Sequence, residues 1–293
     1  MLGSPDVEAV LAWSAGRRDD LPWRQTRDPW AILVSELMLQ QTQVSRVAPR
    51  WLQFLARFPT VADCASAPVG DVVTEWAGLG YNRRAVNLHR AAVQVVESHG
   101  GVVPADLDDL LRLPGLGPYT ARAVLAFAFE KDVAVVDTNV GRILARQRGE
   151  RLTARAAQTF ADDVVPVGRG WSWNQGMLDL GALVCTKRSP SCAKCPVAPS
   201  CAWFRSGAKD PDPAIGSAAV SKGQSRFVGS FREGRARLLD VLRSGVEVRP
   251  DGLRAACGWN DRDGGDLDAI RAAESLVRDG LAVESSDGVF SLP

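Results

Sequence analysis

The first two thirds of the chain carry the hydrophobic periodicity of amphipathic helices. From about residue 5 to 183, apolar side chains recur every three or four positions, and no convincing strand alternation interrupts them. The recurrence is plain in two stretches: Trp30, Leu33, Val34, Leu37 and Met38, and then Val86, Leu88, Ala92 and Val95. Prolines and glycines divide the region into roughly eight to ten helices joined by short loops. The pattern therefore predicts an all-α fold.

A change of pattern near residue 206 predicts a second, smaller domain. Residues 206–225 are rich in Pro, Gly, Ser and Ala and almost free of large apolar side chains, as in a linker. Beyond them, RARLLDVLRSG, DGLRAACGW and LDAIRAAESLVRDG each have helical spacing, and Asp287-Gly288 lies between two short apolar runs as a hairpin turn would. Three helices followed by a hairpin are typical of a winged-helix module. We therefore expect a large helical region at 1–205, a linker at 206–225 and a small winged-helix-like domain at 226–293.

Composition and charge set limits but do not identify a partner. The 293 residues are 46% apolar and 24% charged, which is typical of a globular protein and excludes disorder as the main state. No apolar run approaches the roughly 20 residues that span a bilayer, and the first residues lack a basic segment followed by a long apolar core. We therefore expect neither secretion nor membrane insertion, and a cytoplasmic location. Thirty-five basic and 34 acidic side chains leave a net charge of +1, so a nucleic-acid partner has to be argued from local features.

Six cysteines are unevenly distributed, and four of them predict a metal site. Cys64 and Cys257 are solitary, whereas the other four follow the spacing C-x6-C-x2-C-x5-C. These four are Cys185, Cys192, Cys195 and Cys201. Four thiols so close in sequence, with prolines between them, favour a common metal centre over disulfides in a chain that is not secreted. The spacing alone leaves zinc and an iron-sulfur cluster open, although zinc motifs commonly pair two C-x2-C units.

The segment around these cysteines is locally basic. Between residues 181 and 209 there is no acidic residue, while five positive charges are present: Lys187, Arg188, Lys194, Arg205 and Lys209. Such a cluster is a candidate for binding phosphates. A solvated basic loop without a ligand is the alternative for any one of these residues.

Two glycine turns are candidates for nucleic-acid contact. The motif LPGLGPYT at 113–120 ends one amphipathic segment and opens another, and its two glycines and second proline suit a tight turn before a helix N-terminus. Exposed backbone N–H groups there can hold a phosphate, although an ordinary helix-to-helix turn can have the same sequence. Both tyrosines of the chain, Tyr81 and Tyr119, follow such turns. An aromatic ring at that position can wedge between bases, or it can pack on a neighbouring helix.

Two carboxylates differ from the other acidic residues. Glu36 lies in the otherwise uncharged and largely apolar helix WAILVSELMLQQTQV, where a glutamate is costly unless it faces a cleft or is hydrogen-bonded in the core. Asp137 follows the apolar strip VAVV at a position typical of a helix N-cap. Two carboxylates in different environments can protonate a leaving group and stabilise a cationic sugar. From the residues alone, the structural interpretations of both stay open.

Taken together, these motifs resemble those of a known enzyme family. LPGLGPYTA, VDTNVGRIL and the cysteine spacing are similar to the helix-hairpin-helix, Gly/Pro-Asp, iron-sulfur DNA glycosylases related to endonuclease III. Within that family, LPWR, SELMLQQTQV, GLGYNRRAVNLHRAA and WNQGMLDLGALVC resemble the MutY-type adenine DNA glycosylases. The resemblance covers about residues 10–205. It implies a two-lobed all-α helix-hairpin-helix fold, a [4Fe-4S] cluster on the four cysteines, and double-stranded DNA as the partner, with the target base flipped out.

The resemblance also implies roles for individual residues. Glu36 would protonate adenine at N7 and then assist the attacking water, Asp137 would stabilise the oxocarbenium-like sugar, and Asn139 would lie near it. Gln41 and Tyr81 match residues that probe or wedge the base stack near the opposing base. In the family, three further positions line the adenine pocket: Trp23, Arg24 and Gln175. The phosphate-gripping hairpin corresponds to 113–120, with Gly115, Gly117 and Tyr119.

The positions of the lysines predict the type of reaction. Tyr119 occupies the position of the Schiff-base lysine of bifunctional relatives, and Lys131 is the only lysine before residue 187. We therefore expect a monofunctional glycosylase of base excision repair. It would use water as the nucleophile, remove adenine mispaired with 8-oxoguanine or G, and leave an abasic site.

The chain departs from the family after residue 225. Typical members carry a larger β-rich C-terminal domain that recognises 8-oxoguanine, and its strand pattern is not visible here. Alternative functions are a glycosylase for T or U opposite G, and a non-catalytic iron-sulfur DNA-binding regulator. We expect a monomer, because nothing in the sequence indicates oligomerisation.

Overall fold

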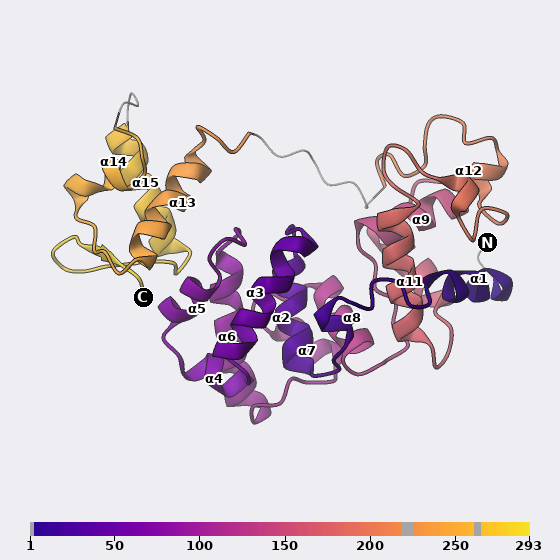
Figure 1. Cartoon of the computed structure of the whole chain (residues 1–293), viewed down its shortest axis with the longest axis horizontal. Helices are drawn as coiled ribbons and strands as arrows, with labels where there is room; N and C mark the ends of the chain where they lie inside the picture. The colour runs from indigo at the N-terminus through magenta and orange to yellow at the C-terminus, as the bar shows by residue number, and fades with distance from the viewer. Residues whose placement is uncertain (1–2, 218–225, 261–264) are drawn as a thin grey trace. The chain divides into compact units, whose positions relative to one another are not determined.

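Helices make up almost all the regular structure of the chain. The computed structural model describes residues 3–217, 226–260 and 265–293. Figure 1 shows helices joined by loops, with a single small hairpin near the C-terminus of the described chain. The all-α prediction is confirmed. Across the described ranges, no helix is both long enough and apolar enough to cross a membrane.

The chain divides into two compact units, and the first takes its residues from 1–32, 105–111 and 116–223. Its helices are α1 (Ser4–Ser14), η1 (Pro22–Arg24), α8 (Pro118–Phe127), α9 (Thr138–Arg148), α10 (Ala154–Val164), α11 (Gly170–Leu183), η2 (Cys192–Lys194) and α12 (Ala202–Arg205). Helix α11 packs against α1 and α9. The core between them contains Val10, Leu144, Trp173 and Leu180, all nearly inaccessible to solvent. Burial of these apolar side chains stabilises the unit.

The second unit takes its residues from 33–104, 112–115 and 224–293. Its helices are α3 (Val44–Arg57), α4 (Val61–Ser66), α5 (Val69–Glu75), α6 (Arg83–His99), α13 (Phe231–Arg243), η3 (Pro250–Gly252), α14 (Leu253–Ala256) and α15 (Gly265–Arg278). Helices α2 (Pro29–Leu39) and α7 (Leu107–Arg112) contain residues of both units. Helices α4 and α5 pack on α6. Phe54 of α3 is completely buried, with its ring 5.0 Å from that of Phe58 and edge-on to Trp76.

The C-terminal residues have the element order that the sequence predicts. Helices α13, α14 and α15 pack on one another, and a hairpin of β1 (Val283–Glu284) and β2 (Phe290–Ser291) follows them. The strands are antiparallel, with Val283 opposite Ser291. Helix α13 also packs on α5 within the same unit. Assignment of this module to the winged-helix class stays a prediction.

The expected linker at 206–225 is only partly described, because residues 218–225 lie outside the described ranges. Its earlier part packs on the first unit. Asp212 and Ser217 are buried, and the Ser217 hydroxyl oxygen accepts a hydrogen bond of 3.1 Å from the backbone N–H of Leu152. Asp212 pairs with the buried side chain of Arg146. A low content of large apolar residues therefore did not prevent this segment from packing, because polar side chains anchor it. The domain boundaries themselves stay a proposal.

Candidate active site

Asp137 caps helix α9, as the sequence suggested. Its Oδ1 accepts hydrogen bonds from the backbone N–H groups of Asn139 (2.8 Å) and Val140 (2.7 Å), two of the donors that a helix N-terminus leaves unpaired. Its Oδ2 accepts a third bond of 2.7 Å from the Asn139 side chain. Burial raises the pKa of this carboxyl above its ordinary value, although the three hydrogen bonds act in the opposite direction. Three hydrogen bonds therefore hold the Asp137 carboxylate in a fixed orientation.

A hydrogen-bonded chain leads from Asp137 towards the cysteine loop. The Asn139 side-chain oxygen accepts a bond of 2.9 Å from Nη2 of Arg142. The same guanidinium donates through Nε to the Cys185 carbonyl (2.6 Å) and through Nη2 to the Gly181 carbonyl (2.6 Å). Arg142 is nearly buried, so these bonds are shielded from water. Arg142 therefore fixes Asn139 against α11 and the start of the loop.

Two residues of α11 allow the Asp137 segment to lie this close. A Cβ at Gly181 would lie 2.6 Å from Cβ of Asn139, so only glycine fits there. Buried Asn174 donates to the carbonyls of Val133 (2.9 Å) and Gly170 (2.8 Å) and accepts from the N–H of Val135 (2.8 Å). These contacts hold the strip before Asp137 on the surface of α11.

Glu36 lies in the second unit, on α2, and is 5% exposed. Its neighbours along the helix, Ser35 and Leu37, are completely buried. Water therefore solvates this carboxyl poorly, as the sequence predicted from its apolar surroundings. Asp137, the other candidate carboxylate, belongs to the first unit.

Gln41 and Tyr81 share an unusual backbone conformation and a common support. Both have positive φ, 57° and 47° respectively, which side chains larger than glycine rarely adopt. The buried guanidinium of Arg84 links the two turns: it donates to the Gln40 carbonyl at 2.6 Å and to the Gly80 carbonyl at 2.9 Å. It also donates to the carbonyls of Leu37 (2.6 Å) and Met38 (2.9 Å) at the end of α2. Burial lowers the pKa of Arg84 to about 10, so the guanidinium stays charged at neutral pH.

The residues expected in the adenine pocket lie in the first unit and differ in their contacts. Trp23 and Arg24 are nearly buried in η1, and Gln175 is half-buried on α11. Arg24 makes a two-pronged ion pair with Asp179 of α11, with distances of 2.8 and 2.9 Å. Arg18 reaches the same carboxylate at 3.3 Å. The Arg24 guanidinium thus holds η1 on α11, and this structural role is one that the sequence did not indicate.

The hairpin at 113–120 has the geometry of a glycine turn followed by a helix. Gly115 has φ of +83°, and a Cβ there would lie 2.7 Å from Cβ of Asn87 in the same unit. Gly117 is the N-cap of α8 and has open space where a side chain would extend. Pro118 occupies the first helical position, and Tyr119 is half-buried. The space beside Gly117, at the N-terminus of α8, is therefore not filled by a neighbouring side chain.

The four clustered cysteines line one pocket of the first unit, together with Arg146 and Trp203. All four are free thiols, and burial raises the pKa of the Cys195 thiol to about 11. Among the described residues, no three His, Cys, Asp or Glu side chains are grouped so that they could hold a single metal ion. Four thiols therefore line one cavity, but they are not grouped around a single point.

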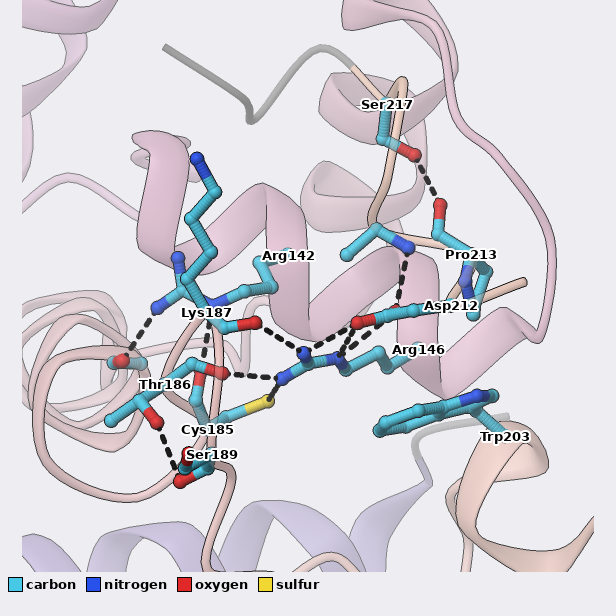
Figure 2. Close-up of polar contacts among 12 residues, drawn as sticks. Arg142, Arg146, Cys185, Thr186, Lys187, Ser189, Trp203, Asp212, Pro213 and Ser217 are labelled. Atoms are coloured by element: carbon cyan, nitrogen blue, oxygen red, sulfur yellow. Dashed lines mark hydrogen bonds and ion pairs between the residues drawn. The ribbon is translucent and has the colours of Figure 1, made fainter. Parts of the chain in front are cut away.

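Arg146 is the polar centre of this region, as Figure 2 shows. Its Nη1 lies 3.3 Å from Sγ of Cys185, and its Nη2 lies 2.6 Å from Oδ2 of Asp212. The Trp203 ring stacks on the guanidinium at 4.7 Å. Burial alone would raise the pKa of Asp212, yet the hydrogen bonds from Arg146 hold it below its usual range. Arg146 therefore places a positive charge beside the cysteine loop.

The basic residues of the loop remain at the surface. All five side chains are exposed to solvent: Lys187, Arg188, Lys194, Arg205 and Lys209. They are accessible to a polyanion, as the local charge predicted, and the solvated-loop alternative stays open.

Sequence reasoning missed three arginines that position the site. Arg84, Arg142 and Arg146 are each less than a tenth exposed, and each donates to several backbone carbonyls. Their signal in the sequence is weak but present. Arg142 and Arg146 are one helical turn apart, at positions where the apolar periodicity of α9 calls for core residues.

Comparison with known proteins identifies the family. A family model described as the HhH-GPD superfamily of base excision DNA repair proteins matches residues 34–163. An adenine DNA glycosylase of Mycolicibacterium smegmatis is 40% identical over 288 residues, which make up 97% of this chain and 94% of that protein. The chain belongs to the HhH-GPD superfamily. The resemblance predicted from the motifs is therefore confirmed.

Solved structures similar to this HhH-GPD protein share its fold. A thermostable thymine-DNA glycosylase has a TM-score of 0.65 and 32% identity, over 68% of this chain and 95% of that one. A trapped endonuclease III–DNA covalent intermediate has a TM-score of 0.61 and 23% identity, over 71% of this chain and 100% of that one. The helix-hairpin-helix glycosylase fold is thereby confirmed. The roles of individual site residues remain to be argued from chemistry.

Proposed function

We propose that the protein is an adenine DNA glycosylase of base excision repair. It would flip a mispaired adenine out of duplex DNA and hydrolyse the bond between the base and its deoxyribose. The observation that carries the proposal is the near full-length similarity to an adenine DNA glycosylase, at 40% identity. The two carboxylates, Glu36 and Asp137, supply the chemistry that this reaction needs.

Glu36 is the proposed general acid. Cleavage of the N-glycosidic bond leaves electrons on the base, and protonation at N7 makes adenine a better leaving group. A protonated carboxyl within reach of N7 can donate that proton. Once the base has left, the same carboxylate can accept a proton from the attacking water. Burial of Glu36 among the apolar residues of α2 supports this role.

Asp137 is the proposed electrostatic partner of the sugar. As the bond breaks, positive charge develops on the deoxyribose ring, and a nearby carboxylate lowers the energy of that state. Three hydrogen bonds fix the Asp137 carboxylate before the reaction starts, so no reorganisation is needed. Asn139 holds Oδ2 in place and is a positioning residue. Trp23 and Gln175 would line the base pocket, with Arg24 supporting its wall.

The preferred substrate would be adenine opposite 8-oxoguanine or G. Gln41 and Tyr81, in their strained turns, are the proposed contacts to the stack at the opposing base. Strained backbone that is firmly supported is typical of functional sites. On the DNA backbone, the N-terminus of α8 at Gly117, the turn at Gly115 and the ring of Tyr119 would hold a phosphate.

The enzyme would be monofunctional, with water as the nucleophile. Tyr119 at the hairpin cannot form a Schiff base, and the described lysines after Lys131 belong to the exposed cysteine loop. Borohydride should therefore trap no covalent DNA adduct. Trapping as efficient as that of a bifunctional glycosylase would contradict this part of the proposal.

The cysteines would hold a [4Fe-4S] cluster. Four thiols line one pocket, and the family resemblance implies that they hold a cluster with one thiolate on each iron. Arg146 beside Cys185 would offset part of the negative charge of the thiolates. When bound, the cluster would fasten the loop and could exchange single electrons. An absorbance band near 400 nm and an iron content of about four per chain would support it, whereas stoichiometric zinc would refute it.

The partner would be double-stranded DNA containing a mispaired adenine, bound by a monomer. Because the substrate is chromosomal DNA, we place the protein in the cytoplasm, at the nucleoid in a bacterium. The exposed basic residues of the cysteine loop would contribute to DNA binding. Sedimentation of the purified protein tests the monomer.

A thymine glycosylase is the second candidate, because the similar thermostable thymine-DNA glycosylase is 32% identical and is covered over 95% of its length. One experiment separates the candidates: purified protein is incubated with duplexes that contain a single A:8-oxoguanine, A:G, T:G or U:G pair, and alkali-labile cleavage is scored. Cleavage of the first two supports the proposal, and cleavage of T:G or U:G alone supports the second candidate. Tight binding with no cleavage of any duplex would support the non-catalytic regulator instead.

A further inference from the structure

A groove lies within the second unit, between the C-terminal module and the two strained turns. It encloses about 680 Å³. One wall contains Gln41, Arg46 and the turn at 78–82, and the other contains Phe227 and the arginines of α13. Gln41 and Tyr81, the residues expected at the opposing base, thus line the same groove as the C-terminal module. The sequence gave no role for this module.

Direct contacts fix the two walls relative to each other. Arg243 of α13 donates to the carbonyl of Val73 (3.0 Å) and to the side-chain oxygen of Asn82 (2.9 Å), the residue that follows Tyr81. At the other end of the module, the Pro293 carbonyl accepts a bond of 2.9 Å from the N–H of Gly70. A Cβ at Gly70 would lie 2.6 Å from that oxygen, so glycine is required for this contact. The groove is therefore built into the unit.

The lining is positively charged, with four arginines against one aspartate: Arg46, Arg232, Arg235 and Arg243 against Asp240. Arg243 pairs with Asp240, and Arg235 pairs with Asp279. Arg46 and Arg232, one on each wall, are exposed to solvent. Excess positive charge on both sides of a groove attracts a chain of phosphates.

Exposed aromatic rings accompany this charge. Tyr81 is 43% exposed and Phe227 is 50% exposed, although both residue types normally bury most of their surface. The guanidinium of Arg232 lies 5.9 Å from the centre of the Phe227 ring. Arginines combined with accessible aromatic rings are the combination that binds a nucleic-acid strand, through its phosphates and the flat faces of its bases and sugars.

We propose that this groove binds the DNA strand opposite the target adenine, with Arg46 and Arg232 contacting its phosphates. The inference rests on the proposed function, because Gln41 and Tyr81 assign the groove to the opposing strand only if they reach the opposing base. The small helical module thus takes part in substrate binding through backbone contacts. Its α13 would hold the opposing strand while the strained turns contact the base stack.

Binding of an uncleavable duplex tests the groove independently of catalysis. The duplex carries a tetrahydrofuran abasic analogue opposite 8-oxoguanine, and Kd is measured by fluorescence anisotropy over a series of KCl concentrations. Arg46→Gln and Arg232→Gln should each weaken binding and reduce the slope of log Kd against log salt by about 0.9, the value for one phosphate contact. Arg237→Gln is the control, because Arg237 is exposed on the same helix, pairs with Glu233 and does not line the groove. Slopes that match wild type in both groove variants would overturn the proposal.

A second set of duplexes identifies the strand. Neutral methylphosphonate linkages are placed on either side of the opposing 8-oxoguanine, or on either side of the abasic analogue in the other strand. With neutral linkages in the opposing strand, Arg46→Gln and Arg232→Gln should cause no further loss of affinity. If the effect disappears only when the other strand is neutralised, the strand assignment is wrong.

Release of adenine by the wild-type enzyme is measured in parallel. Normal release with unchanged salt slopes would refute the groove and leave the proposed function intact. Reduced slopes without any adenine release would refute the proposed function and, with it, the assignment of the strand to a target adenine.

Discussion

The side-chain nitrogen of Asn139 donates a hydrogen bond of 2.7 Å to Oδ2 of Asp137, the oxygen that the helix cap leaves available. The two backbone N–H donors of the cap both bind Oδ1. One carboxylate therefore serves two purposes: one oxygen starts α9, and the other is held by Asn139, which Arg142 holds in turn. The structural and catalytic interpretations of Asp137 are compatible.

Loss of this contact should slow the reaction without unfolding the enzyme. In Asn139→Ala, Oδ2 of Asp137 loses its charge-assisted hydrogen bond, and the single-turnover rate of base release should fall by about tenfold or more. Thr138→Ala is the matched control, because Thr138 is exposed and its side chain has no part in the chain of contacts. Equal rates for wild type and Asn139→Ala would show that Asn139 does not position the carboxylate.

Asp137→Asn should make the protein more stable and the enzyme less active. Burial raises the pKa of Asp137 above its ordinary value of 3.8, so the folded protein binds this proton more tightly than the unfolded chain does. Asp137 therefore costs stability at neutral pH, and this cost disappears as the pH falls below 3.8. Asparagine keeps the helix cap but carries no charge. Urea unfolding should show that Asp137→Asn is more stable than wild type at pH 7, with a gain that shrinks towards pH 4.

The same variant should lose activity at pH 7, by about 10²- to 10³-fold, because the developing sugar cation loses its carboxylate. In wild type, activity should fall as the pH drops through the raised pKa of Asp137, at a pH above that of an ordinary aspartate. A variant that is less stable than wild type and fully active would contradict both roles.

Arg84 should control the two turns together. Arg84→Gln leaves several buried carbonyls without donors, so the free energy of unfolding should fall by about 2–3 kcal/mol. Because the turns that carry Gln41 and Tyr81 lose their common support, the enzyme should discriminate less between A:8-oxoguanine and A:T duplexes in competition binding. Arg83→Gln is the control, since the neighbouring Arg83 side chain is 67% exposed. Unchanged discrimination in Arg84→Gln would remove the positioning role.

Asp212 should slow the loss of iron from the proposed four-cysteine site. Its carboxylate holds the buried Arg146 guanidinium against Cys185, and removal of one member of a buried pair costs about 3 kcal/mol. Asp212→Asn should therefore lose iron faster than wild type in a chelator, followed as decay of the absorbance near 400 nm. Asp210→Asn, two residues earlier and exposed, should decay like wild type. If Asp212→Asn also decays at the wild-type rate, the pair does not support the centre.

Local patterns in the sequence predicted the elements of this molecule well. Helical spacing, the cap at Asp137 and the turn at Gly115 each depend on a few neighbouring residues, and all three are present. Burial of Glu36 also followed from its apolar helix. These features can be predicted without knowing which distant residues they contact.

Contacts between distant residues were not predictable in the same way. The partners in the pair Arg24–Asp179 are 155 positions apart, and those in Arg146–Asp212 are 66 apart. The helical periodicity places Arg142 and Arg146 on the buried face of α9, but it does not identify their distant partners. The packed part of 206–217 was missed for the same reason: its anchors are single polar side chains whose partners lie elsewhere.

Release of adenine by wild type and Glu36→Gln is the most direct test of the proposed chemistry. Single-turnover kinetics with a duplex containing one A:8-oxoguanine pair, at saturating enzyme, measure cleavage separately from binding. Glutamine has the shape of glutamate but cannot protonate the base, so Glu36→Gln should release adenine about 10²- to 10⁴-fold more slowly while binding the duplex with similar affinity. Equal rates for the two proteins would contradict the account.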